Sequence, residues 1–280
     1  MDFLNYEEPK KGFATNLILA GQPGVGKSSL IAGLNKNGYK ALHIDLQGGA
    51  LHIGGYVKDI NKIAAINRIT VTDAFFNVLT SLRKQNIENK APLFDFVVYD
   101  PLICLKPIIE TYATFLYNNS AVGKGVAAKL AKEANRPNDV KAFMSSNVLN
   151  DMGQNGWSYM NQAWTAMKSK MFGLSGICDI IIAHTKYNQL RKTQITEVAV
   201  KEIDFYNNYL LDLIGSASDS GMIYRQDNQV KVSFKFNDDH SHFKSRWYDN
   251  EDFVLSTKDE NGIIAVDWSP IFPFINEPKQ

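Results

Sequence analysis

Eight consecutive residues near the amino end, GQPGVGKS from Gly21 to Ser28, constrain the fold of this chain more than any other segment. They fit the pattern G-x-x-x-x-G-K-[ST] at each fixed position. The apolar run Leu17–Ala20 before them is typical of a buried strand, and Ser29–Leu34 after them has helical spacing. A strand, a glycine-rich turn and a helix in this order place consecutive main-chain N–H groups at a helix N-terminus, where anions bind.

The residue types within this loop suit a nucleoside triphosphate. Glycines let the main chain approach phosphate closely, because they carry no Cβ. We expect Lys27 to reach the β- and γ-phosphates and the Ser28 hydroxyl to ligate Mg²⁺. The expected cofactors are therefore ATP and Mg²⁺. The expected nucleotide contacts are Gly21, Gln22, Pro23, Gly24, Val25, Gly26, Lys27, Ser28 and Ser29.

Composition restricts the remaining classes of protein. The 280 residues are 45% hydrophobic and 21% charged, as in a globular protein, and a net charge of +1 gives no global basic field for nucleic acid. Cys104 and Cys178 follow apolar stretches and fit neither a disulfide framework nor a metal site. The amino end lacks the apolar centre of a signal peptide, and no apolar run approaches the about 20 residues that cross a bilayer. We expect a cytoplasmic protein with no membrane partner.

Strand patterns recur along the chain with helical patterns between them. Buried strands are predicted at Leu17–Ala20, Ala41–Asp45, Phe94–Asp100 and Ile177–Ala183. Period-two alternation predicts antiparallel strands at Met222–Arg225, Val230–Phe236 and Phe243–Tyr248. The expected fold class is α/β, with a mostly parallel sheet flanked by helices and antiparallel strands toward the C-terminus.

The helical patterns differ in strength. Thr72 is the expected N-cap of one helix, and a second resumes at Trp157. Its predicted buried stripe is Met160, Trp164, Met167 and Met171. Residues 118–150 are polar, rich in Asn, Ser, Gly and Lys, and show no convincing amphipathic period, so we expect part of this segment to be mobile.

Two predicted strands end on polar residues that suit the chemistry of a triphosphate. Asp100 follows the apolar run Phe96–Tyr99, and an acid at that point can hold a Mg²⁺-bound water. The alternative is a carboxylate that caps the turn before Pro101. His184 follows Ile180–Ala183 at the carboxyl edge of the sheet, where ligands bind in such folds. It either contacts the γ-phosphate and reports its loss or is an inert imidazole.

The order of these parts resembles the RecA-like core ATPases. After the phosphate loop come strands ending IDLQGG, VVYD and IIAHTK, and the stretches GWSYMNQAWTAM and SASDSGMIYR are also similar to small phage-encoded members linked to recombination and single-strand annealing. The resemblance covers about residues 14 to 248. It implies a single RecA-like domain over 1–280, with 249–280 as a C-terminal extension.

The same resemblance implies activity and partners. It implies ATP hydrolysis, binding of single-stranded DNA, and assembly of identical subunits into a ring or filament in the host cytoplasm. A single-strand-binding protein is a further candidate partner.

The chain departs from the family at one residue. The second strand of RecA-like enzymes commonly ends D-x-E, and this glutamate activates the attacking water; the matching residue here is Gln47. An amide orients water but does not accept its proton, and losing a general base costs about 10² to 10⁴ in rate. We expect slow hydrolysis, with Asp45 as an alternative base or Gln47 positioning the water. The expected catalytic residues are Lys27, Gln47, Asp100 and His184.

RecA-like ATPases place the nucleotide between subunits, so that a neighbour supplies a cation to the γ-phosphate. The resemblance makes Lys186 and Arg246 the candidates, and the alternative for each is a solvated surface charge. The loops that contact DNA in this family follow the third and fourth strands. Here they hold Lys124, Lys129, Lys132, Lys186, Arg191 and Lys192, with acidic residues among them that make solvated loops an alternative.

Two other functions stay open. A small-molecule kinase usually carries an arginine-rich lid, and residues 118–150 hold only Arg136. A non-hydrolysing, ATP-switched assembly protein fits Gln47. The apolar stretch Trp268–Ile275 either docks on another subunit or partner, or packs on its own domain, and Phe3 and Leu4 raise the same question.

Overall fold

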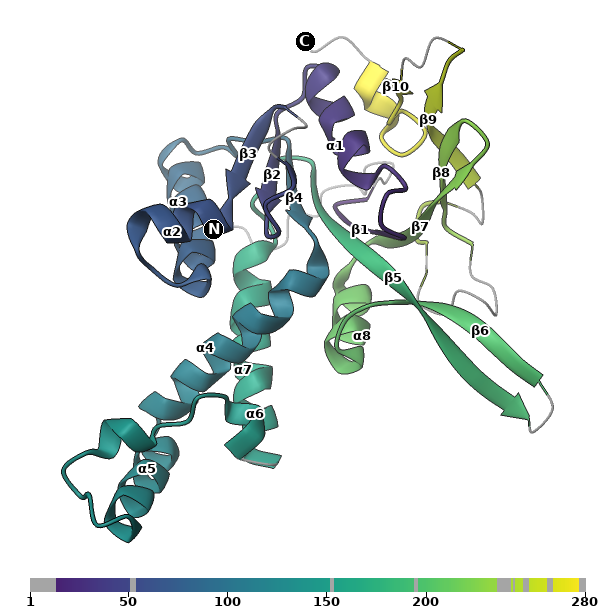
Figure 1. Cartoon of the computed structure of the whole chain (residues 1–280). Helices are drawn as coiled ribbons and strands as arrows, with labels where there is room; N and C mark the ends of the chain where they lie inside the picture. The colour runs from purple at the N-terminus through teal and green to yellow at the C-terminus, as the bar shows by residue number, and fades with distance from the viewer. Residues whose placement is uncertain are drawn as a thin grey trace, which may run out of the picture. The chain divides into compact units, whose positions relative to one another are not determined.

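The computed structural model describes residues 14–50, 54–151, 154–193, 196–235, 243, 245–248, 252–260 and 264–276 (Figure 1). The described residues form two compact units. Unit 1 lies within Met1–Ala41, Asp95–Val98 and Ile177–Gln280, and unit 2 lies within Leu42–Phe94 and Tyr99–Gly176. None of the helices among the described residues has the length and apolar character that crossing a bilayer requires.

Unit 1 is built around a buried central strand. This strand, β1 (Asn16–Gly21), pairs in parallel with β5 (Cys178–Thr193) on one side and β7 (Asp219–Gln226) on the other. The remaining strands pair antiparallel: β6 (Thr196–Ile203) with β5, and then β8 (Gln229–Ser233), β9 (Asp252–Lys258) and β10 (Ile264–Val266) in succession beyond β7. The other elements of the unit are α1 (Lys27–Lys36), α8 (Asn207–Ser216) and the 3-10 turn η4 (Pro273–Asn276).

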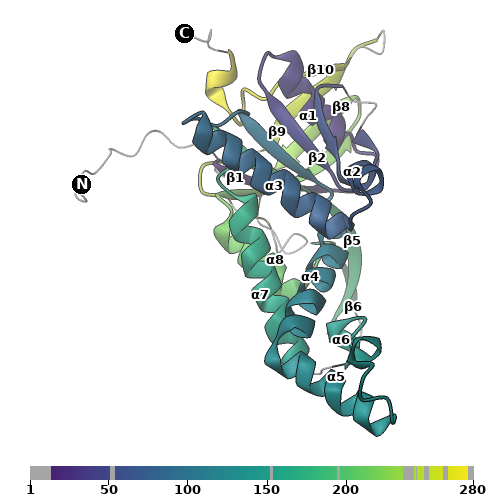
Figure 2. The same ribbon diagram turned by 90° about the vertical axis from the view of Figure 1, so that its left-hand side faces the viewer.

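Unit 2 is mostly helical. Its parallel strands β2 (Ala41–Asp45) and β3 (Tyr56–Asp59) pair with each other. Its long helices α4 and α7 run side by side in both views (Figures 1 and 2). The helices are α2 (Ile60–Asn67), α3 (Val71–Glu88), α4 (Leu105–Asn119), α5 (Ala121–Glu133), α6 (Val148–Asp151) and α7 (Gln154–Met171), with 3-10 turns η2 (Leu102–Cys104) and η3 (Val140–Phe143).

The strand order confirms the predicted fold class. Hydrogen-bonded neighbours follow the order β10-β9-β8-β7-β1-β5-β4-β2-β3, with β6 on β5, where β4 (Phe96–Asp100) begins in unit 1 and ends in unit 2. The chain is a mixed α/β protein whose sheet is largely parallel and gains antiparallel strands toward the C-terminus. The fully buried patterns of β2 and β4 match the continuous apolar runs of the sequence, which are typical of strands covered on both faces.

The predicted stripe of α7 is confirmed. Its four large apolar side chains are at most 3% exposed, and these are Met160, Trp164, Met167 and Met171. Their spacing of three and four residues places them on one face of the helix.

The apolar C-terminal stretch packs within unit 1. Trp268, Ile271 and Phe272 are fully buried, and the Trp268 indole N–H donates to the main-chain oxygen of Leu30 in α1 at 2.8 Å. The Phe272 and Phe96 ring centroids are 5.1 Å apart. Residues after 248 therefore supply two strands and part of the core of the same unit, whereas Phe3 and Leu4 lie outside the described residues.

Several local predictions were wrong. The N-cap of α3 is Thr70 instead of Thr72, since the Thr70 side chain accepts from the Asp73 N–H at 3.0 Å. The strand predicted at Met222–Arg225 is confirmed, but it belongs to β7 and pairs in parallel with β1 as well as antiparallel with β8. The described residues of Phe243–Tyr248 form no strand.

Residues 118–150, in which the sequence shows no convincing helical period, contain the helix α5. Ser120 caps this helix by accepting from the Gly123 N–H at 3.1 Å. Its buried residues are small (Gly123, Ala127 and Ala131), so no stripe of large apolar side chains marks it in the sequence. A Cβ on Gly123 would lie 2.2 Å from the Tyr117 oxygen, and this close approach explains a glycine inside a helix.

Candidate functional site

The glycine-rich segment lies where β1 passes into α1 (Figure 1). Gly24 and Gly26 have φ values of +79° and +100°, in the left-handed region that favours glycine. Gly26 is the N-cap of α1 and adds no side-chain hydrogen bond, and the first helical turn contains no acidic residue. Neither a capping side chain nor a like charge therefore opposes an anion at this helix start, which the helix dipole favours.

Close packing also requires glycine in the loop. A Cβ on Gly21 would lie 2.6 Å from the main-chain oxygen of Ile223 in β7, a distance that real side chains do not tolerate. A Cβ on Gly26 would lie 3.6 Å from the Val230 methyl carbon and 3.7 Å from an Arg225 guanidinium nitrogen. The loop is thus packed against β7 and β8, which fix its position relative to β1.

Lys27 turns back over its own loop. Its side chain is buried, and Nζ donates to the main-chain oxygens of Gly21 at 2.9 Å and Gln22 at 2.7 Å. These bonds hold the ammonium group inside the loop that the sequence assigns to phosphate. Ser28 is half-buried in the first turn of α1, and Ser29, Gln22, Pro23 and Gly24 are exposed. The hydroxyl of Ser28 is a ligand type that Mg²⁺ accepts.

Arg225 is a cation near the loop that the sequence analysis did not single out. It lies on β7 two residues after Ile223, which pairs with Gly21. Its side chain is exposed, and within the part of the chain that the structure describes no hydrogen bond or ion pair engages it. Arg225 ends the stretch SASDSGMIYR, but only the parallel pairing of β7 with β1 reveals that it lies near the loop.

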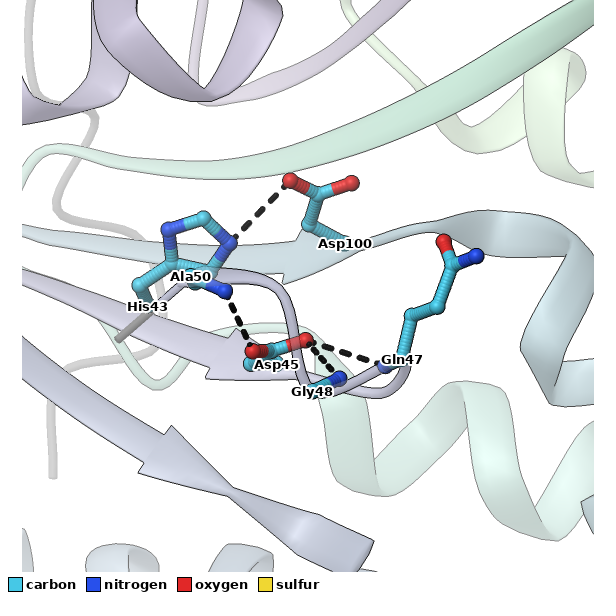
Figure 3. Close-up of polar contacts among 6 residues, drawn as sticks. All are labelled: His43, Asp45, Gln47, Gly48, Ala50 and Asp100. Carbon is cyan, nitrogen blue, oxygen red and sulfur yellow. Dashed lines mark hydrogen bonds and ion pairs between the residues drawn. The ribbon is translucent and has the colours of Figure 1, made fainter. Parts of the chain in front are cut away.

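Two buried carboxylates mark the ends of β2 and β4 in unit 2 (Figure 3). Asp100 is 8% exposed, and its Oδ2 lies 3.1 Å from Nε2 of His43. The main-chain oxygen of Asp100 accepts from the Leu46 N–H at 2.8 Å. The fold therefore holds this residue at both its main chain and its side chain.

Asp45 organises the turn that follows β2. Its Oδ1 accepts from the N–H groups of Gln47 at 2.9 Å and Gly48 at 2.8 Å, and its Oδ2 accepts from Ala50 N–H at 2.7 Å. Because both oxygens bind the main chain, a proton taken up by Asp45 would weaken the turn. This arrangement favours a structural role for Asp45 over the alternative role of general base.

The Gln47 side chain lies on the outside of this turn. It is exposed, and in Figure 3 it points away from Asp45 while its main-chain N–H bonds to that carboxylate. The turn thus fixes the backbone of Gln47 and presents an amide to the surroundings. An amide there can orient a water but cannot take its proton.

The two carboxylates affect the ionisation of a nearby thiol, that of Cys104. The pKa of its thiol is raised by burial and then by the charges of Asp100 and Asp45. The thiol is therefore protonated at neutral pH.

His184 lies beside the phosphate loop. It follows the buried part of β5 and pairs in register with Gly21, the last residue of β1. Its ring is half-buried, and its main-chain oxygen accepts from the Asp204 N–H at 2.8 Å. Lys186, two residues later, contacts Asp204 at 3.4 Å, so its ammonium is engaged within its own chain.

Arg246 is anchored far from the loop. Its N–H donates at 2.7 Å to Asp219, which pairs with Leu17 at the beginning of β1, whereas the phosphate loop follows the end of that strand. The Arg246 side chain is exposed. Within one chain, therefore, Arg246 does not join the loop.

The remaining candidate DNA-contacting cations fall into two groups. Lys124, Lys129 and Lys132 lie on α5 instead of a loop, and Lys129 pairs with Glu133 at 3.8 Å. The side chains of Arg191 and Lys192 lie outside the described residues.

Comparison with known proteins adds little to this picture. No protein-family model matches the chain, and no curated protein matches it. One similar solved structure is described as the crystal structure of the RadB recombinase, with 16% identity over 90% of this chain and 91% of that chain and a TM-score of 0.37. An identity and a TM-score this low do not establish a family, so the assignment of function depends on the residues themselves.

Proposed function

We propose that this chain binds Mg²⁺–ATP and hydrolyses it slowly as a RecA-like ATPase that acts on single-stranded DNA in recombination or annealing. The observation that carries the proposal is the loop from Gly21 to Ser28. It combines the full phosphate-binding pattern with left-handed glycines and a helix start that no side chain caps. The RecA-like assignment is supported by the order of the motifs after the loop.

Each residue of the site has a proposed role. Lys27 exchanges its two carbonyl partners for the β- and γ-phosphates, and Ser28 ligates Mg²⁺. Asp100 holds a water of the metal ion, and His184 senses the γ-phosphate from its place beside Gly21. Mg²⁺, when bound, neutralises phosphate charge, and the donor types present fit it because they are oxygens.

Slow turnover follows from the turn after β2. Gln47 replaces the glutamate that the resemblance leads us to expect, and the oxygens of the nearby Asp45 already accept three main-chain N–H bonds. Gln47 is therefore proposed to position the attacking water without accepting its proton. Hydrolysis without a strong base is slower by about 10² to 10⁴.

The proposed partners follow from the RecA-like assignment. They are other copies of this chain in a ring or filament, single-stranded DNA, and a single-strand-binding protein, in the cytoplasm of the host of a phage that encodes it. Lys186 and Arg246 remain the proposed cations that a neighbouring subunit supplies, and the exposed side chain of Arg246 is the better placed of the two, because Lys186 pairs with Asp204.

A second candidate is an ATP-switched assembly protein that does not hydrolyse ATP. The specific observation in its favour is again the turn after β2, where Asp45 is engaged and position 47 is an amide. A small-molecule kinase is less well supported, because Arg136, the one arginine within 118–150, forms an ion pair with Asp139.

Phosphate release with and without single-stranded DNA separates these functions. We expect slow release that DNA stimulates. Tight ATP binding without release would favour the assembly protein, and transfer of phosphate to a metabolite would favour the kinase. Binding to single-stranded DNA across a salt series then tests the DNA contact, since affinity that depends on lysine–phosphate contacts falls as salt rises.

A further inference from the structure

His43 contacts the carboxylate that the proposed function assigns to the metal ion. It lies on β2 and is 3% exposed, and its Nε2 is 3.1 Å from Oδ2 of Asp100 at the end of β4 (Figure 3). Because an ionised carboxylate only accepts hydrogen bonds, this contact requires the ring to donate its Nε2–H. His43 is therefore a donor to one defined oxygen of Asp100.

The surroundings give this bond an orienting effect. The main chain of Asp100 is held by the Leu46 N–H at 2.8 Å, and its side chain is held at Oδ2 by His43 at 3.1 Å. The bond to His43 at Oδ2 restricts rotation of the carboxylate about its side-chain bonds and so contributes to the direction of its oxygens. The other acid of this region, Asp45, is fixed separately by the three N–H groups of its turn.

We propose that His43 is a positioning residue, which orients the Asp100 carboxylate for the Mg²⁺ of the nucleotide. The inference depends on the proposed function, because it concerns the metal ion that accompanies ATP. Carboxylates that ligate metal ions are themselves commonly held by hydrogen bonds, and losing such a partner typically weakens metal binding about 10- to 100-fold. Because Asp100 acts through a metal-bound water, we expect an effect at the lower end of this range. His43 does not touch the nucleotide in this account and acts through Asp100 alone.

Three substitutions separate the hydrogen bond from simple packing. In His43→Gln the amide nitrogen lies the same number of bonds from Cβ as Nε2 and can donate to Asp100. In His43→Asn the same chemical group is one carbon shorter, and in His43→Leu the donor is absent. The measurement is the affinity for Mn²⁺ in the presence of a nonhydrolysable ATP analogue, followed by the electron paramagnetic resonance of free Mn²⁺. Affinity for the analogue in EDTA is measured for each variant.

We expect Mn²⁺ affinity to fall about tenfold in His43→Asn and His43→Leu and to stay within about twofold of wild type in His43→Gln. Affinity for the analogue in EDTA should stay unchanged in all three. Wild-type Mn²⁺ affinity in His43→Asn, or an equal loss in His43→Gln and His43→Asn, would overturn the inference. If His43→Leu does not fold, the comparison of His43→Gln with His43→Asn still tests the inference. If wild-type protein fails to bind the analogue even with Mn²⁺, the proposed function itself is wrong and the inference falls with it.

Discussion

The phosphate loop of unit 1 is built by neighbouring residues along the chain, whereas the carboxylate region of unit 2 is built by residues that only the fold brings together. The loop needs left-handed glycines and a helix start, all within Gly21–Ser28. The carboxylate region joins His43 to Asp100 across 57 positions of sequence. A site built from neighbouring residues tolerates substitutions elsewhere in the chain as long as its backbone conformation is kept. A site built from distant residues is lost when the strand pairing that brings those residues together is lost.

The largest expected effect concerns Phe272, which lies in the core of the unit that carries the loop. Phe272 is fully buried against Phe96. It belongs to the same C-terminal stretch as Trp268, whose indole N–H donates to Leu30 in α1. We expect Phe272→Ala to lower the free energy of unfolding by about 3–5 kcal/mol, because it removes a large buried ring and leaves a cavity. Urea denaturation measures this. Phe274→Ala, at a partly buried position, is the control and should cost clearly less. If both variants lowered the free energy of unfolding by the same small amount, the C-terminal stretch would not contribute to the stability of unit 1.

In the carboxylate region of unit 2, we expect a single substitution to lower the free energy of unfolding by less than Phe272→Ala does. Asp45→Asn replaces one acceptor oxygen by an NH₂ group in a turn that offers three N–H donors. We expect a loss of about 1–3 kcal/mol in unfolding free energy, since a buried donor is left unsatisfied. Asp59→Asn is the matched control: Asp59 caps α2 through the Lys62 N–H at 2.9 Å, and asparagine caps equally well. A neutral Asp45→Asn would contradict the structural role given to Asp45.

The chemistry of the same turn is tested by Gln47→Glu. The substitution supplies a proton acceptor at the exposed position that the turn already fixes. We expect ATP hydrolysis to rise about tenfold or more, at the lower end of what a general base contributes. Phosphate release in single-turnover conditions measures it, and Gln47→Ala should show no rise. An unchanged or lower rate in Gln47→Glu would count against Gln47 as the residue that faces the attacking water.

The smallest expected effect uses Cys104 as a probe of charge. Burial and the carboxylates of Asp100 and Asp45 raise the pKa of this thiol. Asp100→Asn removes one of these charges, so the pKa should fall and the thiolate fraction at pH 8 should rise. We expect alkylation by iodoacetamide to be about twofold to fivefold faster. Cys178 is fully buried, so we expect Cys104 to be the thiol that is alkylated. Loss of the alkylation in Cys104→Ser confirms this. Slower alkylation would show that Asp100 does not carry its charge near Cys104.

The two regions also differ in how far the sequence predicts them. The apolar runs predict β1, β2, β4 and β5, because strands covered on both faces need continuous apolar residues. The loop follows from its motif. The bond between His43 and Asp100 and the position of Arg225 depend on pairing between strands, which no local pattern encodes. The helix α5 escapes prediction because it buries glycine and alanine instead of large side chains.

The central claim is that the main chain of Gly21–Ser28 and the ammonium of Lys27 bind a triphosphate. The most direct test is the affinity of Lys27→Ala for a nonhydrolysable ATP analogue, with Lys36→Ala at the exposed end of α1 as control. A charge-assisted hydrogen bond contributes about 1.5–3 kcal/mol, so affinity should fall about 10- to 150-fold in Lys27→Ala and stay unchanged in Lys36→Ala. Full affinity in Lys27→Ala would contradict the account.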